Sequence, residues 1–194
     1  LGDVSAWSAY RSLFAEWLQH EGATDVLGQV LPGLMTGCGA AAFHGPIRLA
    51  AAVRSGHHGE VADALAYWAS RHQPLGLAGA GPADALPPGD GPEPDPEALL
   101  RRLAAGRSRQ PLIVQRMVAA ARDDGFHRTL ALLQVDERTL PRLARLSAQA
   151  YACSGNFTAL HLVTAWHAAR VLLRFIDDAA DQFVDGRGPD RDAG

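Results

Sequence analysis

The chain has 194 residues, of which 47% are hydrophobic and 20% are charged, a composition typical of one globular domain with its own apolar core. Its 18 basic residues face 21 acidic residues, so the formal net charge is −3. This balance leaves no positive surplus for phosphate neutralisation, and nucleic acid is not an expected partner. All the basic residues are arginine, which excludes Schiff-base lysines, P-loop lysines and carboxylated-lysine metal ligands.

The cysteines and the apolar runs indicate the compartment. Cys38 and Cys153 lie far apart in a chain without a signal-like amino terminus, so we expect two free, buried thiols in a reducing cytoplasm. The apolar runs are interrupted well before the roughly 20 residues that a membrane span needs. We therefore predict a soluble cytoplasmic protein that does not enter a membrane.

Alanine is the commonest residue, and apolar side chains recur at helical spacing rather than alternating. This pattern predicts an all-α fold, a multi-helix, bundle-like single domain. The predicted helices cover residues 5–20, 24–34, 36–55, 58–72, 96–105, 111–123, 126–134 and 138–153, and a final helix follows Asn156.

Glycine and proline mark the predicted helix ends and breaks. Gly22 is expected to end the first helix, and Pro32 to bend or shorten the second. Gly45 and Pro46 are expected to interrupt the hydrogen-bond ladder of the third segment, with His44 at the break. A break inside a helix is a common place for a functional site.

The chain divides into four parts by composition. Residues 1–73 form an amino-terminal helical part, and 74–96 form a long surface loop or linker that is rich in proline and glycine. Residues 97–182 form a carboxy-terminal helical part of the same domain. Residues 183–194 are a polar tail.

The histidines carry the most chemical information. His44 lies among alanine and phenylalanine at the predicted break, where a ligand role and a buried structural role are about equally good interpretations. His161 and His167 are six residues apart on the final helix, roughly 120° around its axis, so they are not a chelating pair by themselves. Thr164 lies between them. Arg48, one turn after His44, suits either a ligand oxygen or a neighbouring acid.

Common catalytic motifs are absent from the sequence. It contains no HExxH, ExxH, CxxC, GxSxG or EF-hand pattern. The stretch GLAGAG at 76–81 is not GxGxxG and follows no predicted strand, so no dinucleotide site is expected there.

Two stretches resemble the questin oxidase-like family. They are FHGPIRLAAAVRS at 43–55, continuing to ALAYWASRHQPL at 64–75, and GNFTALHLVTAWHAAR at 155–170. The resemblance extends from about Trp7 to Arg174. Members of the family are mostly helical proteins linked to the oxidation or ring opening of aromatic polyketides such as anthraquinones.

The resemblance implies a histidine-ligated, non-haem Fe(II) centre that activates dioxygen beside an aromatic substrate. Carried over by residue, His44, His161 and His167 become candidate metal ligands, and Arg48 and Thr164 become candidate catalytic or substrate-contacting residues. Neutral imidazoles suit Fe(II), which needs open positions for dioxygen and substrate. NADPH use is implied by the resemblance alone.

Four aromatic residues are candidate walls of the substrate cavity, although ordinary helix packing is the better interpretation for each. They are Phe43, Tyr67, Trp68 and Trp166.

The chain is shorter than members of this family, which begin with additional helices that contain further histidine. We therefore expect a homo-oligomer, or a partner chain that supplies these helices. The alternative function is a non-catalytic helical protein that binds a hydrophobic polycyclic ligand or a partner subunit.

Overall fold

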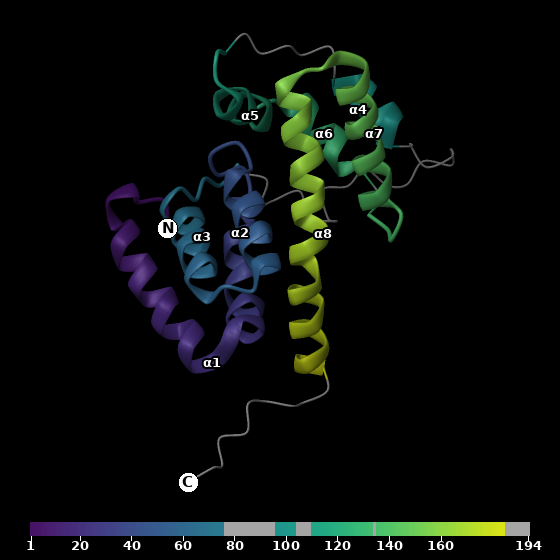
Figure 1. Ribbon diagram of the computed structural model, residues 1–194. Helices are drawn as coiled ribbons and strands as arrows, with labels where there is room; N and C mark the ends of the chain where they lie inside the picture. Colours follow the sequence, from purple (N-terminus) through teal and green to yellow (C-terminus); the bar gives the residue numbers. More distant parts are fainter. Residues whose placement is uncertain (76–95, 104–109, 134, 185–194) are drawn as a thin grey trace.

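Figure 1 shows the computed structural model of the chain. It describes residues 1–75, 96–103, 110–133 and 135–184, and the side chains of these except 101–103 and 177–184. This part of the chain is helical and contains no strands, which confirms the all-α prediction. The elements are η1 (Val4–Ala6), α1 (Trp7–Met35), α2 (His44–Ser55), α3 (His58–Ser70), α4 (Pro96–Leu103), α5 (Ile113–Ala121), α6 (Asp124–Ala131), α7 (Thr139–Ser154) and α8 (Phe157–Val184).

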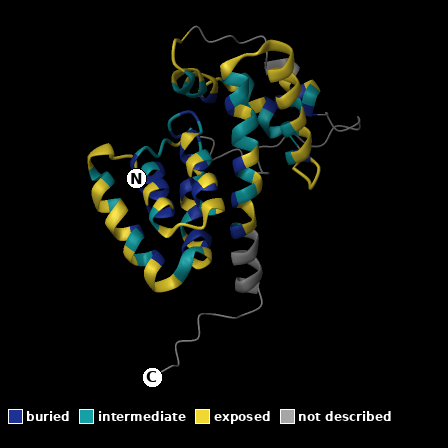
Figure 2. Cartoon of the chain, in the orientation of Figure 1, coloured by how far each residue is buried: buried dark blue, intermediate teal, exposed yellow. Residues whose placement is uncertain are grey.

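The apolar core lies where α3 packs on α1 and α2, and where α8 packs on the same two helices. Figure 2 shows buried residues concentrated on these helices, whereas α4 to α7 are mostly half-buried or exposed. Alanines on α2 and α3 bring the two backbones close together. The largest fully buried side chains include Leu18, Leu27, Leu31, Leu49, Leu65, Trp68 and Leu172.

The long helix α8 joins two helical groups, the first formed by α1 to α3 and the second by α4 to α7 (Figure 1). It contacts α7 as well as α1 and α2. Trp166 fixes the α7 contact, because its indole N–H donates a hydrogen bond of 2.9 Å to the hydroxyl of Ser147. Trp166 is therefore part of a helix–helix contact, in line with the packing interpretation.

The predicted glycine and proline positions have two different outcomes. Gly22 has non-helical angles, φ 81° and ψ 166°, and kinks α1 at the predicted position. Gly45 and Pro46 do not interrupt a helix, and that expectation is wrong. They occupy the first turn of α2, where the missing N–H of proline removes no intrahelical hydrogen bond.

Trp68 packs against the first turn of α2 and contacts the segment just after α1. It is fully buried, and its indole N–H donates a hydrogen bond of 3.1 Å to the carbonyl of Gly37. Its ring lies directly against Gly45, where an added Cβ would come within 2.7 Å of the indole Cγ. Trp68 therefore belongs to the core and fixes both ends of the segment between α1 and α2.

The structure also bears on the predictions for the cysteines, for membrane spans, and for the linker and the tail. Cys38 and Cys153 are both free thiols, but only Cys38 is half-buried, and the expectation of a buried Cys153 is wrong. None of the described helices is long and apolar enough to cross a membrane. The predicted linker falls mainly on 76–95, and most of the predicted tail on 185–194, outside the described residues.

We predict that Gly45→Ala destabilises the fold. The added methyl group meets a fully buried indole, and such overpacking costs about 1 to 3 kcal/mol. The free energy of unfolding from urea denaturation measures this. Gly33→Ala is the matched control, because Gly33 is an exposed helical residue with nothing near its Cβ position, and it should gain about 0.5 to 1 kcal/mol. Equal effects of the two substitutions would contradict this assignment of Gly45.

Candidate functional site

The chain reaches His44 through an unusual turn. Ala41, Ala42 and Phe43 are consecutive residues in the left-handed region, with φ of 47°, 58° and 69°. Non-glycine residues adopt this conformation only when the surrounding structure enforces it, and such strain is concentrated at functional sites. The turn ends at Phe43, the N-cap of α2, so that His44 is the first residue of the helix.

Contacts from the segment after α3 hold the beginning of this turn. The ring of His72 lies against Gly37, leaving no space for a side chain there. The same ring makes a hydrogen bond of 3.0 Å with the hydroxyl of Thr36. A parallel bridge joins Cys38 to Gln73. These contacts, together with Trp68, fix the turn against α3.

His161 lies in the first turns of α8 and is one of few buried polar residues, with 7% of its surface exposed. Its Nδ1 atom lies 2.8 Å from the carbonyl oxygen of Phe157. A carbonyl only accepts hydrogen bonds, so Nδ1 carries the proton and Nε2 of the neutral ring has a free lone pair. The Phe157 ring meets the imidazole edge-on, with 4.5 Å between ring centroids.

The structure brings His44 and His161 together across the α2–α8 contact. Their Nε2 atoms are 3.3 Å apart, and their rings are nearly perpendicular at 82°. Two arrangements fit this geometry. Either His44 donates an Nε2 proton to the lone pair of His161, or both lone pairs face one cation.

The pair fits a transition metal ion as two ligands. Two imidazole nitrogens that are each about 2.1 Å from one ion lie about 3.0 to 3.4 Å apart at bond angles of 90° to 109°. The 3.3 Å separation falls in this range. Metal-binding histidines usually donate the other ring N–H to an oxygen, as His161 does to Phe157. Within the ranges that the structure describes, no group of three histidine, cysteine or acidic residues is arranged to hold a metal ion.

His44 is the residue of the pair with a shifted pKa. Partial desolvation lowers the pKa of its imidazole, and electrostatic interactions with His161 and with Arg48 lower it further. The neutral form of His44 is thus favoured, which is the form that binds metal.

An apolar cavity of about 220 Å³ opens beside His161, between α5, α6 and the start of α8. Phe43, at the end of the left-handed turn, forms part of its wall. The other lining residues are Leu75, Ile113, Met117, Ala120, Ala121, Phe126, Thr158, His161 and Leu162.

The other two candidate residues on α8, His167 and Thr164, contact other groups than the histidine pair. His167 is exposed, and its Nε2 atom lies 3.1 Å from Nη1 of Arg54, so the structure does not bring it to the histidine pair. The hydroxyl of Thr164 lies 3.2 and 3.1 Å from the backbone carbonyls of Leu160 and His161. It is engaged within its own helix.

Arg48 and Tyr67 lie in a separate groove on the α2–α3 side of the molecule, where the guanidinium of Arg48 stacks on the Tyr67 ring. Of the predicted site residues, Phe43 and His161 line the apolar cavity, and Arg48 and Tyr67 line this groove. Phe157 and Phe126 were missed as site residues. The position of Phe157, one helical turn before His161, is the feature of the sequence that identifies it.

Comparisons with known proteins do not assign this site. No family model, curated protein or solved structure matches the chain.

We predict that acid destabilises the metal-free protein through His44. Its pKa in the folded chain is below the ordinary value of 6.5, so the unfolded chain binds more protons at this site between the two values. The free energy of unfolding should therefore fall as the pH decreases below about 6.5, and less so in His44→Asn. Denaturation of both proteins at pH 7.5 and 5.5 measures this. An unchanged pH dependence in the variant, or an NMR titration of His44 at or above 6.5, would contradict it.

Proposed function

We propose that the chain is an oxidoreductase similar to the questin oxidase-like proteins, in which His44 and His161 hold a non-haem Fe(II) ion beside an aromatic polyketide substrate. The observation that supports this most directly is the 3.3 Å separation of their Nε2 atoms. The carbonyl of Phe157 adds support, because it sets the tautomer of His161 that leaves Nε2 free to bind metal.

In this proposal, the residues of the chain bind and orient, and the iron supplies the activation of dioxygen when bound. His161 is held by Phe157 and by burial, and His44 by the left-handed turn and the helix that follows it. Two protein ligands leave open positions for dioxygen and substrate. NADPH as electron donor stays a prediction from the resemblance.

The cavity beside His161 suits an apolar aromatic ligand. Its wall is almost entirely apolar and includes Phe43, Phe126 and Met117. At about 220 Å³ it is smaller than the 300 to 1,000 Å³ typical of sites for drug-sized ligands. We therefore propose that it takes one edge of a polycyclic substrate, and excludes water from the ring that faces His161.

A second chain, or a further segment, would complete this centre. Phe157, whose ring contacts His161, has 67% of its surface exposed. A large exposed aromatic beside a buried imidazole favours a covering partner. We propose a homo-oligomer or a partner subunit whose helices cover this face and supply a further ligand.

The second candidate function is a non-catalytic protein that binds a hydrophobic polycyclic ligand. The apolar cavity favours it independently of any metal. Metal content separates the two candidates.

We predict that the purified, chelator-stripped protein, reloaded anaerobically with Fe(II), retains iron in near-stoichiometric amount. His44→Ala and His161→Ala should each lower the affinity for Fe(II) about tenfold or more, because each removes one of the two bonds between histidine and iron. His167→Ala, on the same helix as His161 but paired with Arg54, should retain iron like the unmodified protein. Iron analysis after gel filtration measures this. Equal retention by all four proteins, or loss in His167→Ala alone, would contradict the proposed centre.

A further inference from the structure

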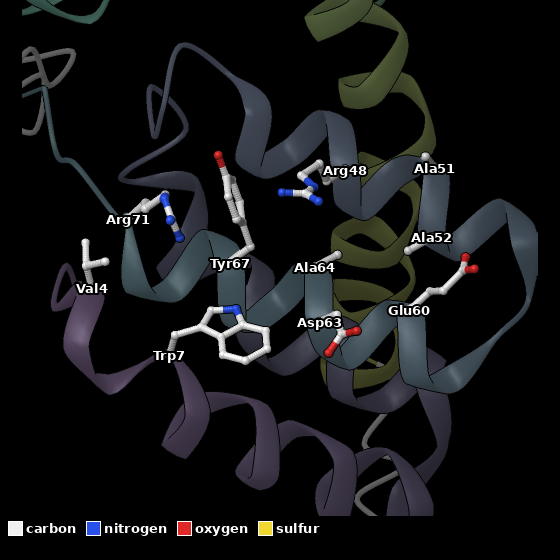
Figure 3. A pocket seen from close by; sticks show the side chains of 10 residues that line it. All are labelled: Val4, Trp7, Arg48, Ala51, Ala52, Glu60, Asp63, Ala64, Tyr67 and Arg71. Atoms are coloured by element: carbon white, nitrogen blue, oxygen red, sulfur yellow. The ribbon is translucent and has the colours of Figure 1, made fainter.

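A second hollow lies along α2, between this helix and α3. It is a groove of about 610 Å³ between the start of α1, α2 and α3 (Figure 3), and it shares no lining residue with the cavity beside His161. Its alanine lining, made by Ala51, Ala52 and Ala64, leaves room for a ligand. Trp7 forms part of the rim.

The polar feature of this groove is a stack of three side chains. Tyr67 stands between two arginines, with the guanidinium carbon of Arg48 4.4 Å from its ring centroid and that of Arg71 4.2 Å from it. Figure 3 shows the two arginines on opposite sides of the ring. Nη1 of Arg71 also donates a hydrogen bond of 3.3 Å to the hydroxyl of Ser70. Stacking orders each guanidinium and leaves further N–H groups at its edge to bind a ligand.

The acidic side chains of the groove have hydrogen-bond partners other than the two stacked arginines. Asp63 accepts a hydrogen bond of 2.5 Å from Arg11, and Glu60 accepts one of 2.7 Å from Ser55. Among the described residues, neither Arg48 nor Arg71 forms an ion pair with an acidic side chain. Glu60 and Asp63 also line the groove, but neither forms an ion pair with Arg48 or Arg71, so the end of the groove at Tyr67 holds two positive charges that attract an anion.

We propose that Arg48, Tyr67 and Arg71 form a binding site for the oxyanion of a small molecule, a phosphate or a carboxylate, whose organic part lies against Trp7 and the alanine lining. Guanidinium groups bind both oxyanions through paired hydrogen bonds, and the ordered stack reduces the entropy lost on binding. The site goes beyond the histidine centre and does not require that a metal bind there.

Titration of the metal-free full chain with phenyl phosphate, benzoate and phenol tests this site, with binding followed by calorimetry and by the NMR signals of the arginine Nε–H groups and of Trp7. Saturable binding of one or both anions, weakened by salt, and none of phenol is expected. The two anions distinguish a phosphate site from a carboxylate site. Arg48→Gln and Arg71→Gln should each weaken binding about tenfold or more.

Arg174→Gln is the matched control, because Arg174 stacks on Phe175 at 4.7 Å, away from the groove, and its loss should leave affinity unchanged. Tyr67→Leu should weaken binding although both charges remain, whereas Tyr67→Phe should not. Circular dichroism verifies that each variant is folded. Absence of saturable binding of both anions, full affinity in Arg71→Gln, or equal losses in Arg174→Gln would overturn the proposal.

Discussion

The contact between the buried indole of Trp68 and the backbone on either side of the left-handed turn is the constraint on which the candidate site depends. The indole N–H bonds the carbonyl of Gly37 before the turn, and the ring fills the space above Gly45 after it. Ala41, Ala42 and Phe43 remain in an unfavourable conformation because both ends of their segment are fixed. The strain therefore sets the position of His44, which begins α2 at a defined point relative to α8.

The long helix α8 supplies the second histidine of the candidate site. Its contacts with α1 and α2 place His161 beside His44, and its contact with α7 belongs to the second helical group. The cavity beside His161 uses residues of both groups, including Phe43 from the first and Met117 from the second. The imidazole pair thus lies where an apolar ligand can approach, while the Arg48–Tyr67–Arg71 groove lies between α2 and α3 and shares no lining residue with this cavity.

Local sequence patterns predicted the helices well because apolar spacing and helix-ending residues act over short distances, as the kink at Gly22 illustrates. The turn before α2 was not predictable in the same way. Left-handed residues are usually glycine or asparagine, and here packing around Trp68 overrides that preference in an Ala-Ala-Phe segment. His44 and His161 are 117 residues apart, so no spacing rule predicts their contact, and the resemblance alone gave them a shared role. The six-residue spacing from His161 correctly indicated that His167 lies on another side of its helix.

The most direct test of the account is the state of the imidazole nitrogens of His44 and His161, observed by long-range ¹H–¹⁵N NMR while Zn(II) is added to the metal-free protein as a diamagnetic substitute for Fe(II). The account predicts that Nδ1 of His161 stays protonated throughout, and that the Nε2 signals of both residues shift together to one metal-bound state. Coordination through Nδ1 of His161, or a shift of only one of the two residues, would contradict the claim that this pair holds a single metal ion.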